Sequence, residues 1–577
     1  MRLKCDANLI ARTPVVKQNQ KLTEMLFIMR FFNSVHNATD GLFHVCSVEC
    51  VGPTEEKGNF FWTVKSVDMI RFITIMWVIT GHAFFFDGDA DNAKKFFDAP
   101  RYWANDVFMN AYVAVDTFFL LSGLVVAWNY FKGLQRDPSA YKKPLNWIKY
   151  YVHRYLRLTP CYLLFIAFVI AWTPQMHGPW ALGAQMNMTE QVEVCRDTWW
   201  RNALYINNFQ SMFKNCIPPS WFLAVDMQMF WAAPILLILM AISAKVGIVA
   251  CISTMIASTS AVYYLIMYYD LPATGQTRKS MFEQEFLNMI YTKPWIRCAP
   301  FIIGILLGYW MQKIKHDDDS KWIMSKIDWK ISTMAWIASV AAALLTIFGI
   351  HDYIAGESDM VPFTRATYYA FSRIGWSLAI AWVILACNTD NAGPIASVMN
   401  HNFWTPLGRL TYCAYLLHFF VLQYLFNQRD RPAHFVSVWY TWLSSGVSST
   451  VLSFMAAIIW SCLVERPAGK MEIAITDIFM KGGRRSNTNT VKPYETSQID
   501  KVNGAPAKMK NVQTISIGFP LEMPMERPHT PSTSRTSSTE PARDSSSQDL
   551  NGVSSHRRIF SNSQEEKNDE RPTLYRF

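Results

Sequence analysis

The sequence contains few charged residues for its length. Only 17% of its 577 residues are Asp, Glu, Lys or Arg, whereas 51% are hydrophobic, including 38 Phe, 28 Met and 22 Trp. Ordinary soluble domains carry about 25% charged residues. The mean hydropathy of +0.07 averages an apolar region with a polar one that begins at about residue 480. This composition excludes a typical soluble enzyme, and it is explained by a multi-pass membrane protein with a soluble tail.

Other signatures are missing as well. The composition excludes collagen, a coiled coil and a disulfide-dense secreted module. No G-x-S-x-G, Walker or G-x-G-x-x-G element stands in a convincing context, and nucleic-acid motifs are absent. His44, Cys46 and Cys50 lack a fourth ligand at a usable spacing, so no metal is expected. The net charge of +10 fits basic cytoplasmic loops better than nucleic-acid binding.

Long apolar runs predict the fold. A helix needs about 20 mostly apolar residues to cross the hydrocarbon core of a bilayer. Ten such runs lie at 67–86, 107–130, 156–173, 221–242, 246–267, 295–314, 331–350, 366–387, 408–427 and 436–463. The predicted fold class is all-α, a polytopic membrane helical bundle with about ten transmembrane helices. We expect a lead-in over 1–60, a transmembrane domain over 61–470 and a disordered cytosolic tail over 471–577.

The charge of the connecting loops predicts the orientation. The second connection, 131–157, holds seven Lys and Arg against one Asp, and a later even-numbered connection is also rich in Lys. The positive-inside rule therefore places these connections and both termini in the cytosol. The third connection, 174–220, is then lumenal or extracellular. It contains a sequon at Asn187, a candidate glycosylation site, and the candidate disulfide pair Cys195 and Cys216, which suit an oxidising compartment.

The two ends of the chain differ from its apolar middle. Residues 1–60 contain an apolar stretch that is too short to span, so we expect a mobile lead-in. The C-terminal tail is rich in Ser, Thr and Pro and cannot bury a core. We expect this tail to be phosphorylated or to bind regulatory proteins. The predicted location is the endoplasmic reticulum or the plasma membrane.

The first predicted span carries three ionisable residues. Such residues are expensive in a bilayer and are functional candidates by default. Asp68 and Arg71 are three positions apart, and His82 follows Arg71 by eleven, so all three lie near one helix face, with Arg71 and His82 about 16 Å apart along the axis. The alternatives are that Arg71 reaches lipid phosphates and that His82 is satisfied by a neighbouring helix.

Later spans also carry polar side chains: Asp116, Asp226, Gln228, Arg297, Arg373, His418 and Glu465. Any one of them could simply join two helices by hydrogen bonds. Two histidines, several acids and several arginines in different spans together predict a polar cavity inside the bundle.

Several segments resemble the acyltransferase 3 family of membrane proteins. They are the Arg71-(x10)-His82 spacing, the stretch Val-Asp116-Thr-Phe-Phe-Leu-Leu-Ser-Gly123 and the run from Tyr151 to Pro160. The segments 200–209, 221–228, 293–297 and 411–418 look like its animal branch, the nose-resistant-to-fluoxetine group. The resemblance is colinear over about 60–470. Members of that branch usually carry a longer, cysteine-bearing lumenal domain before the first span, where about 60 unlike residues stand here.

The resemblance implies transfer of an acyl group, acetyl or longer, from acyl-CoA to a hydroxyl of a lipid, sugar or other small acceptor. It casts His82 as general base and Arg71 as a group that stabilises negative charge. Arg154 and Arg157 would bind the phosphates of the CoA moiety, with ordinary positive-inside charge as the alternative. The candidate acceptor-side or supporting residues are Asp68, Asp116, Asp226, Gln228 and His418.

A second class of function uses the same cavity without acyl chemistry. In that case the protein is a membrane carrier or accessory factor for lipids or hydrophobic drugs. The expected partners are membrane lipids, acyl-CoA and an unidentified hydroxyl acceptor, and no nucleic acid.

Overall fold

The structure is a computed structural model of the chain. It describes residues 64–87, 90–176, 188–278, 283–316, 329–389, 391–428 and 431–482. The chain divides into two units, Met1–Arg485 and Ser486–Phe577, and all described residues belong to the first. The predicted lead-in, the sequon at Asn187 and the chain beyond 482 lie outside the described residues.

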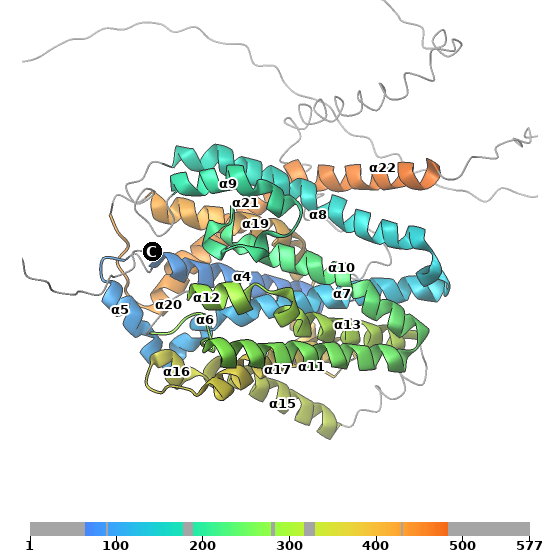
Figure 1. The fold of residues 1–577 in the computed structure, drawn as a ribbon, viewed down its shortest axis with the longest axis horizontal. Coiled ribbons are helices and arrows are strands. Elements are labelled where there is room, and N and C mark those ends of the chain that lie inside the picture. Colours follow the sequence, from blue (N-terminus) through green and yellow to red (C-terminus); the bar gives the residue numbers. More distant parts are fainter. Residues whose placement is uncertain are drawn as a thin grey trace, which may run out of the picture. The chain divides into compact units, whose positions relative to one another are not determined.

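The described part of the chain folds into α-helices, which confirms the predicted fold class (Figure 1). The long helices are α4 (Ser66–Asp87), α7 (Ala114–Arg136), α8 (Pro144–Trp172), α10 (Trp221–Ile242), α11 (Ala244–Tyr269), α13 (Pro294–His316), α15 (Trp329–Phe348), α17 (Pro362–Asn388), α19 (Trp404–Asn427), α21 (Val447–Trp460) and α22 (Arg466–Gly482). The shorter helices are α5 (Ala93–Asp98), α6 (Asp106–Met109), α9 (Met188–Ala203), α12 (Gln284–Phe286), α16 (His351–Ala355), α18 (Pro394–Met399) and α20 (Val438–Thr441). Three π-helical turns are η11 (Leu287–Tyr291), η12 (Trp442–Gly446) and η13 (Ser461–Glu465).

Nine helical segments among the described residues are long and apolar enough to cross a membrane. They correspond to nine of the ten predicted apolar runs. The remaining run, 408–427, falls in α19, which has 24 residues but is less apolar than the nine. Because α19 packs on both α4 and α21, it nevertheless belongs to the bundle. The chain is a multi-pass membrane protein.

Several helix boundaries differ from the predicted ones. Helix α8 begins at Pro144, twelve residues before the predicted span, so the basic connection expected over 131–157 is mostly helical. Proline at the first helical position suits this start, because its missing N–H has no partner there in any case. The third connection contains a helix of its own, α9. Helix α22 continues past residue 470, where the transmembrane domain was predicted to end.

Helices α7 and α13 pack closely at the centre of the bundle (Figure 1). Glycines on both helices allow this contact, as is common between membrane helices. A Cβ on Gly123 would lie 2.0 Å from the carbonyl oxygen of Phe301, and a Cβ on Gly304 would lie 2.1 Å from that of Leu120. Only glycine fits at such a distance, so this pair of residues sets the separation of the two helices.

Helix α15 packs on α17 and exposes much of its surface. Its exposed side chains are apolar, among them Met334 at 69%, Ile337 at 64% and Leu345 at 68% exposed. In a soluble protein such a surface would favour aggregation, whereas lipid tails cover it in a bilayer. The surface of α15 therefore agrees with a lipid-facing position.

Candidate active site

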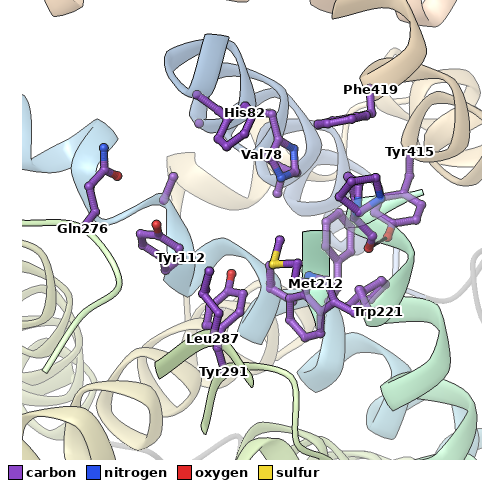
Figure 2. A pocket seen from close by; sticks show the side chains of 18 of the residues that line it. Val78, His82, Tyr112, Met212, Trp221, Gln276, Leu287, Tyr291, Tyr415 and Phe419 are labelled. Carbon is purple, nitrogen blue, oxygen red and sulfur yellow. Dashed lines mark hydrogen bonds between the residues drawn. The ribbon is translucent and has the colours of Figure 1, made fainter. Parts of the chain in front are cut away.

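An apolar cavity of about 100 Å³ lies among the helices that carry the predicted site (Figure 2). Aromatic side chains dominate its wall. The lining residues are Val78, Gly81, His82, Phe85, Phe108, Met109, Ala111, Tyr112, Val115, Phe118, Met212, Pro218, Pro219, Trp221, Phe222, Gln276, Leu287, Tyr291, Tyr415 and Phe419. We call this space the aromatic cavity. Burial raises the pKa of Tyr291 to about 12, so its phenol stays protonated at neutral pH.

The one imidazole on the wall of the aromatic cavity, His82 of α4, contacts the imidazole of His418 on α19. Nδ1 of His82 lies 2.9 Å from Nε2 of His418, and the two rings stack with their centroids 5.0 Å apart. His418 is fully buried, and its Nδ1 lies 2.5 Å from the carbonyl oxygen of Tyr415. The two histidines and this carbonyl form a continuous hydrogen-bonded chain.

The carbonyl oxygen at one end of this chain determines where the protons lie. A carbonyl can only accept, so Nδ1 of His418 carries the hydrogen and donates it to Tyr415. In the neutral imidazole, Nε2 of His418 is then an acceptor, and Nδ1 of His82 must be the donor. The remaining nitrogen, Nε2 of His82, keeps its lone pair. The arrangement leaves a hydrogen-bond acceptor on the residue that lines the aromatic cavity, which is the state a general base needs.

Arg71 and Asp68 lie at the other end of α4, away from the hydrogen bonds that join His82, His418 and Tyr415. Neither belongs to the described residues that line the aromatic cavity. The Asp68 carboxylate is buried, and Arg71, Arg409 and Thr405 surround it. A Cβ on Gly408 would lie 2.6 Å from Oδ1 of Asp68, so α19 approaches the carboxylate closely. The structure therefore places Asp68 in a polar contact between α4 and α19, with Arg71 beside it on α4.

Arg154 of α8 is engaged by groups of the protein. Its guanidinium forms an ion pair and hydrogen bond with Asp226 of α10, donates to Ser122 Oγ at 3.4 Å and stacks on the ring of Phe230 at 4.3 Å. Arg157, one turn further along α8, is exposed. The predicted phosphate-binding pair thus consists of one paired and one exposed arginine.

Gln228 holds the loop after α9 against α10. Its amide nitrogen donates to the Tyr205 carbonyl oxygen at 2.7 Å and to Asn208 Oδ1 at 2.8 Å. The Asn208 amide in turn donates to Gln228 Oε1 at 3.1 Å. Neither Gln228 nor Asp226 is among the described residues that line the aromatic cavity. The structure therefore gives Gln228 a contact that ties the loop after α9 to α10.

Nearby, Lys293 donates to the Asn208 carbonyl oxygen at 3.0 Å. Burial lowers the pKa of this amine, because the charged form loses hydration. The loop after α9 is therefore also tied to the start of α13.

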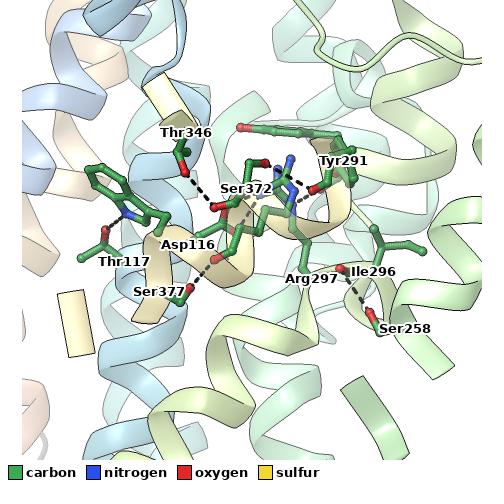
Figure 3. Close-up of polar contacts among 12 residues, drawn as sticks. Asp116, Thr117, Ser258, Tyr291, Ile296, Arg297, Thr346, Ser372 and Ser377 are labelled. Carbon is green, nitrogen blue, oxygen red and sulfur yellow. Dashed lines mark hydrogen bonds and ion pairs between the residues drawn. The ribbon is translucent and has the colours of Figure 1, made fainter. Parts of the chain in front are cut away.

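Asp116 joins three helices (Figure 3). Its fully buried carboxylate accepts from Arg297 Nη1 of α13 at 2.9 Å and from Arg373 Nη1 of α17 at 2.7 Å. Arg297 also donates from Nε to the carbonyl oxygen of Tyr291 at 2.9 Å, and its guanidinium stacks on that ring at 4.2 Å. Asp116 was predicted as a supporting residue, and here it bonds α7 to its two neighbours.

The candidate disulfide pair of the sequence, Cys195 and Cys216, is joined by a disulfide. Gln191 of α9 donates to the Cys216 carbonyl oxygen at 2.9 Å and accepts from Gln423 of α19 at 2.9 Å. The bridge and these bonds tie α9 to the segment that leads into Pro218 and Pro219, two residues of the cavity wall.

The comparisons with known proteins agree with this architecture. The sequence model of the acyltransferase 3 family, described as an acyltransferase domain, matches residues 64–463. The chain belongs to the acyltransferase 3 family. The match includes both His82 and His418.

Two curated nematode proteins are similar. Nose resistant to fluoxetine protein 6 of Caenorhabditis elegans is 28% identical over 455 residues, which cover 74% of this chain and 54% of that protein. Regulator of hypoxia-inducible factor 1 of the same organism is 28% identical over 446 residues, which cover 70% of this chain and 79% of that protein. The chain thus spans about half the length of the first relative. No solved structure matches the chain.

Sequence reasoning missed most of the wall of the aromatic cavity. Tyr112, Trp221, Tyr291 and Tyr415 stand in or beside apolar runs, where aromatic residues resemble ordinary core. A detectable signal was available for Tyr415, which is three residues before His418 and so lies on the same helix face. The other three come together only through packing of separate helices.

Proposed function

We propose that this protein transfers an acyl group from acyl-CoA to a hydroxyl acceptor, with His82 as general base. The observation that carries the proposal is the pair of hydrogen bonds that links the Tyr415 carbonyl to His418 and His418 to His82. These bonds leave Nε2 of His82 able to accept a proton beside the aromatic cavity. Membership of the acyltransferase 3 family supports the reaction class.

In the proposed reaction, the acceptor hydroxyl donates its proton to Nε2 of His82 as its oxygen attacks the thioester carbonyl carbon. A C–O bond forms, the C–S bond to CoA breaks, and the CoA thiolate leaves and takes the transferred proton from Nε2 of His82, which restores the base. The imidazolium that forms on His82 keeps its contact with His418, whose orientation is held by the Tyr415 carbonyl. General-base catalysis of this kind contributes about 10²–10⁴-fold to a rate.

The lining of the aromatic cavity favours an acceptor with a large apolar part. Phe118, Trp221, Phe222 and Phe419 offer rings but no charge to a bound molecule. A lipid-like alcohol matches that wall better than a free sugar does. For the acyl donor, we propose that the CoA phosphates bind to the face of α8 that carries two arginines. Arg157 is exposed there, and Arg154 lies one turn before it.

We further propose that both termini and the basic end of α8 are cytosolic, and that α9 with its disulfide lies on the other side of the membrane. The charge of the 131–157 segment and the disulfide Cys195–Cys216 support this orientation. If it is right, glycosidase treatment shifts the mass of the expressed protein, and Asn187→Gln abolishes the shift. A shift that survives this substitution contradicts the assignment of Asn187.

The apolar cavity also favours a second candidate, a carrier or accessory protein for lipids or hydrophobic drugs. The name of the first nematode relative refers to resistance to fluoxetine. The two functions separate in one experiment on the full-length protein in liposomes with labelled acyl-CoA and extracted lipids. Acyl transfer requires the wild type to consume donor faster than His82→Ala does. Equal consumption, together with lipid or drug uptake that depends on the protein, supports the carrier.

A further inference from the structure

A second cavity of about 20 Å³ adjoins the aromatic one. Tyr112 and Tyr291 line both cavities, and their rings meet edge to face with centroids 5.2 Å apart. The second cavity is also lined by Tyr369 and Arg373 of α17. A single water needs about 10–15 Å³ on this measure, so the space accepts one compact polar group.

The charges beside the second cavity do not cancel. The Asp116 carboxylate carries one negative charge, and it is shared by two arginines, Arg297 and Arg373, each with one positive charge. The cluster therefore has a formal excess of one positive charge. Arg297 is fully buried and Arg373 is 6% exposed, so water cannot screen this excess effectively. A further buried carboxylate, Asp106, is paired with His351 at 3.0 Å.

Several hydrogen-bond donors around this cavity are unused. Within the described part of the chain, Tyr112 Oη, Tyr369 Oη and Arg373 Nε are buried and have no hydrogen-bond partner. Tyr369 is 1% exposed, and its ring lies under the Arg373 guanidinium at 3.9 Å. A buried donor without a partner costs free energy, and a bound acceptor relieves that cost.

We propose that the second cavity binds the oxyanion group, carboxylate or phosphate, of an amphipathic molecule whose apolar part occupies the aromatic cavity. An oxyanion supplies the missing negative charge and accepts from both tyrosine hydroxyls and from Arg373. The wall shared by Tyr112 and Tyr291 allows one molecule to reach both spaces. The proposal concerns binding and does not depend on acyl transfer.

The test uses the full-length protein in lipid nanodiscs and isothermal titration calorimetry. Octyl phosphate and octanoate are the anionic probes, octanol is the neutral probe, octyltrimethylammonium is the cationic one, and inorganic phosphate lacks the chain. At least one anionic octyl probe should bind ten times more tightly than octanol or the cation. Equal affinity for octyl phosphate, octanoate and octanol overturns the oxyanion site. Inorganic phosphate binding as tightly as octyl phosphate overturns the link to the aromatic cavity.

Variants locate the site. Arg373→Gln removes the excess charge and should weaken binding of the anionic probe at least tenfold while leaving octanol unchanged. Tyr369→Phe and Tyr112→Phe keep the ring and remove only a hydroxyl, so they remain informative if the arginine variant fails to fold, and each should weaken anion binding several-fold. Tyr412→Phe is the matched control, because its hydroxyl donates to the Leu158 carbonyl oxygen elsewhere. Unchanged anion affinity in both tyrosine variants overturns the assignment. The probes are titrated without acyl-CoA, so anion binding is expected even if the wild type transfers no acyl group, which separates this proposal from the fate of the proposed enzyme.

Discussion

Nδ1 of His82 lies 2.9 Å from Nε2 of His418, although 336 residues separate them in the sequence. The contact joins the first described helix, α4, to α19, and it continues to the Tyr415 carbonyl oxygen. It gives His82 a defined tautomer, with Nε2 free beside the aromatic cavity. His418 is therefore a positioning residue in the proposed reaction.

Substitution of His418 tests that role. In His418→Gln the side chain can turn either its amide oxygen or its amide nitrogen toward His82, so the tautomer of His82 is no longer enforced. We expect the turnover number for acyl transfer to fall by about 10–100-fold, because His82 itself remains and its loss would cost the larger factor of about 10²–10⁴. The Michaelis constant for acyl-CoA should change little. Steady-state kinetics in liposomes measures both constants. A rise in the Michaelis constant alone would contradict a positioning role.

Removing the Asp116 carboxylate should destabilise the bundle. Asp116→Ala leaves Arg297 and Arg373 buried without their anion, a change that costs about 3–5 kcal/mol when one partner of a buried pair is lost. Thermal unfolding in detergent measures the loss. Asp137→Asn is the control: Lys143 lowers the pKa of the Asp137 carboxyl through a hydrogen bond, but the pair is exposed. Equal unfolding temperatures for the two variants would contradict the account of Asp116.

Two glycines of α7 should respond in opposite ways to the same substitution. Gly123→Ala places a methyl group against the Phe301 carbonyl of α13 and should destabilise by about 1–3 kcal/mol or more. Gly133→Ala meets no atom within 4 Å and should stabilise the helix by about 0.5–1 kcal/mol. Unfolding temperatures in the same detergent compare them. A stable Gly123→Ala protein would show that α7 and α13 are not held at this distance.

The disulfide between Cys195 and Cys216 should stabilise the wall of the aromatic cavity. It closes a loop with a sequence separation of 21, for which chain entropy predicts about 3 kcal/mol. Cys195→Ala should lower the unfolding temperature, and reductant should lower that of the wild type by more than that of the variant, in which Cys462 is still disulfide-bonded. Cys251→Ala, which removes a buried free cysteine of α11, is the control for reductant sensitivity. A wild type that is indifferent to reductant would contradict the stabilising role.

The sequence predicted the helices better than the site. Runs of about 20 apolar residues identify membrane helices because the bilayer demands that length, and the ionisable His82 stood out within such a run. The partner of His82 was not predictable, because the rotation of α19 against α4 decides whether His418 faces it. Arg154 was predicted from the family resemblance as a phosphate ligand, and its contact with Asp226 depends equally on how α8 lies on α10.

The edges of the helices were also hard to predict. Basic residues marked 131–157 as a connection, yet charged side chains are compatible with a helix that leaves the bilayer, and α8 begins at Pro144. Apart from Tyr415, the aromatic residues of the cavity wall gave no signal in the sequence either. Tyr112 and Tyr291 have the apolar neighbours that a core residue has, and only the assembled bundle shows the space between them.

The pH dependence of acyl transfer by the wild type and by His82→Gln tests the central claim most directly. If neutral His82 accepts the acceptor's proton, the wild-type turnover number rises with pH along a limb that corresponds to loss of one proton, because only the unprotonated imidazole is active. The His82→Gln protein should keep only a residual rate, and that rate should lack the limb. A limb that persists in His82→Gln would show that another group is the base and would contradict the account.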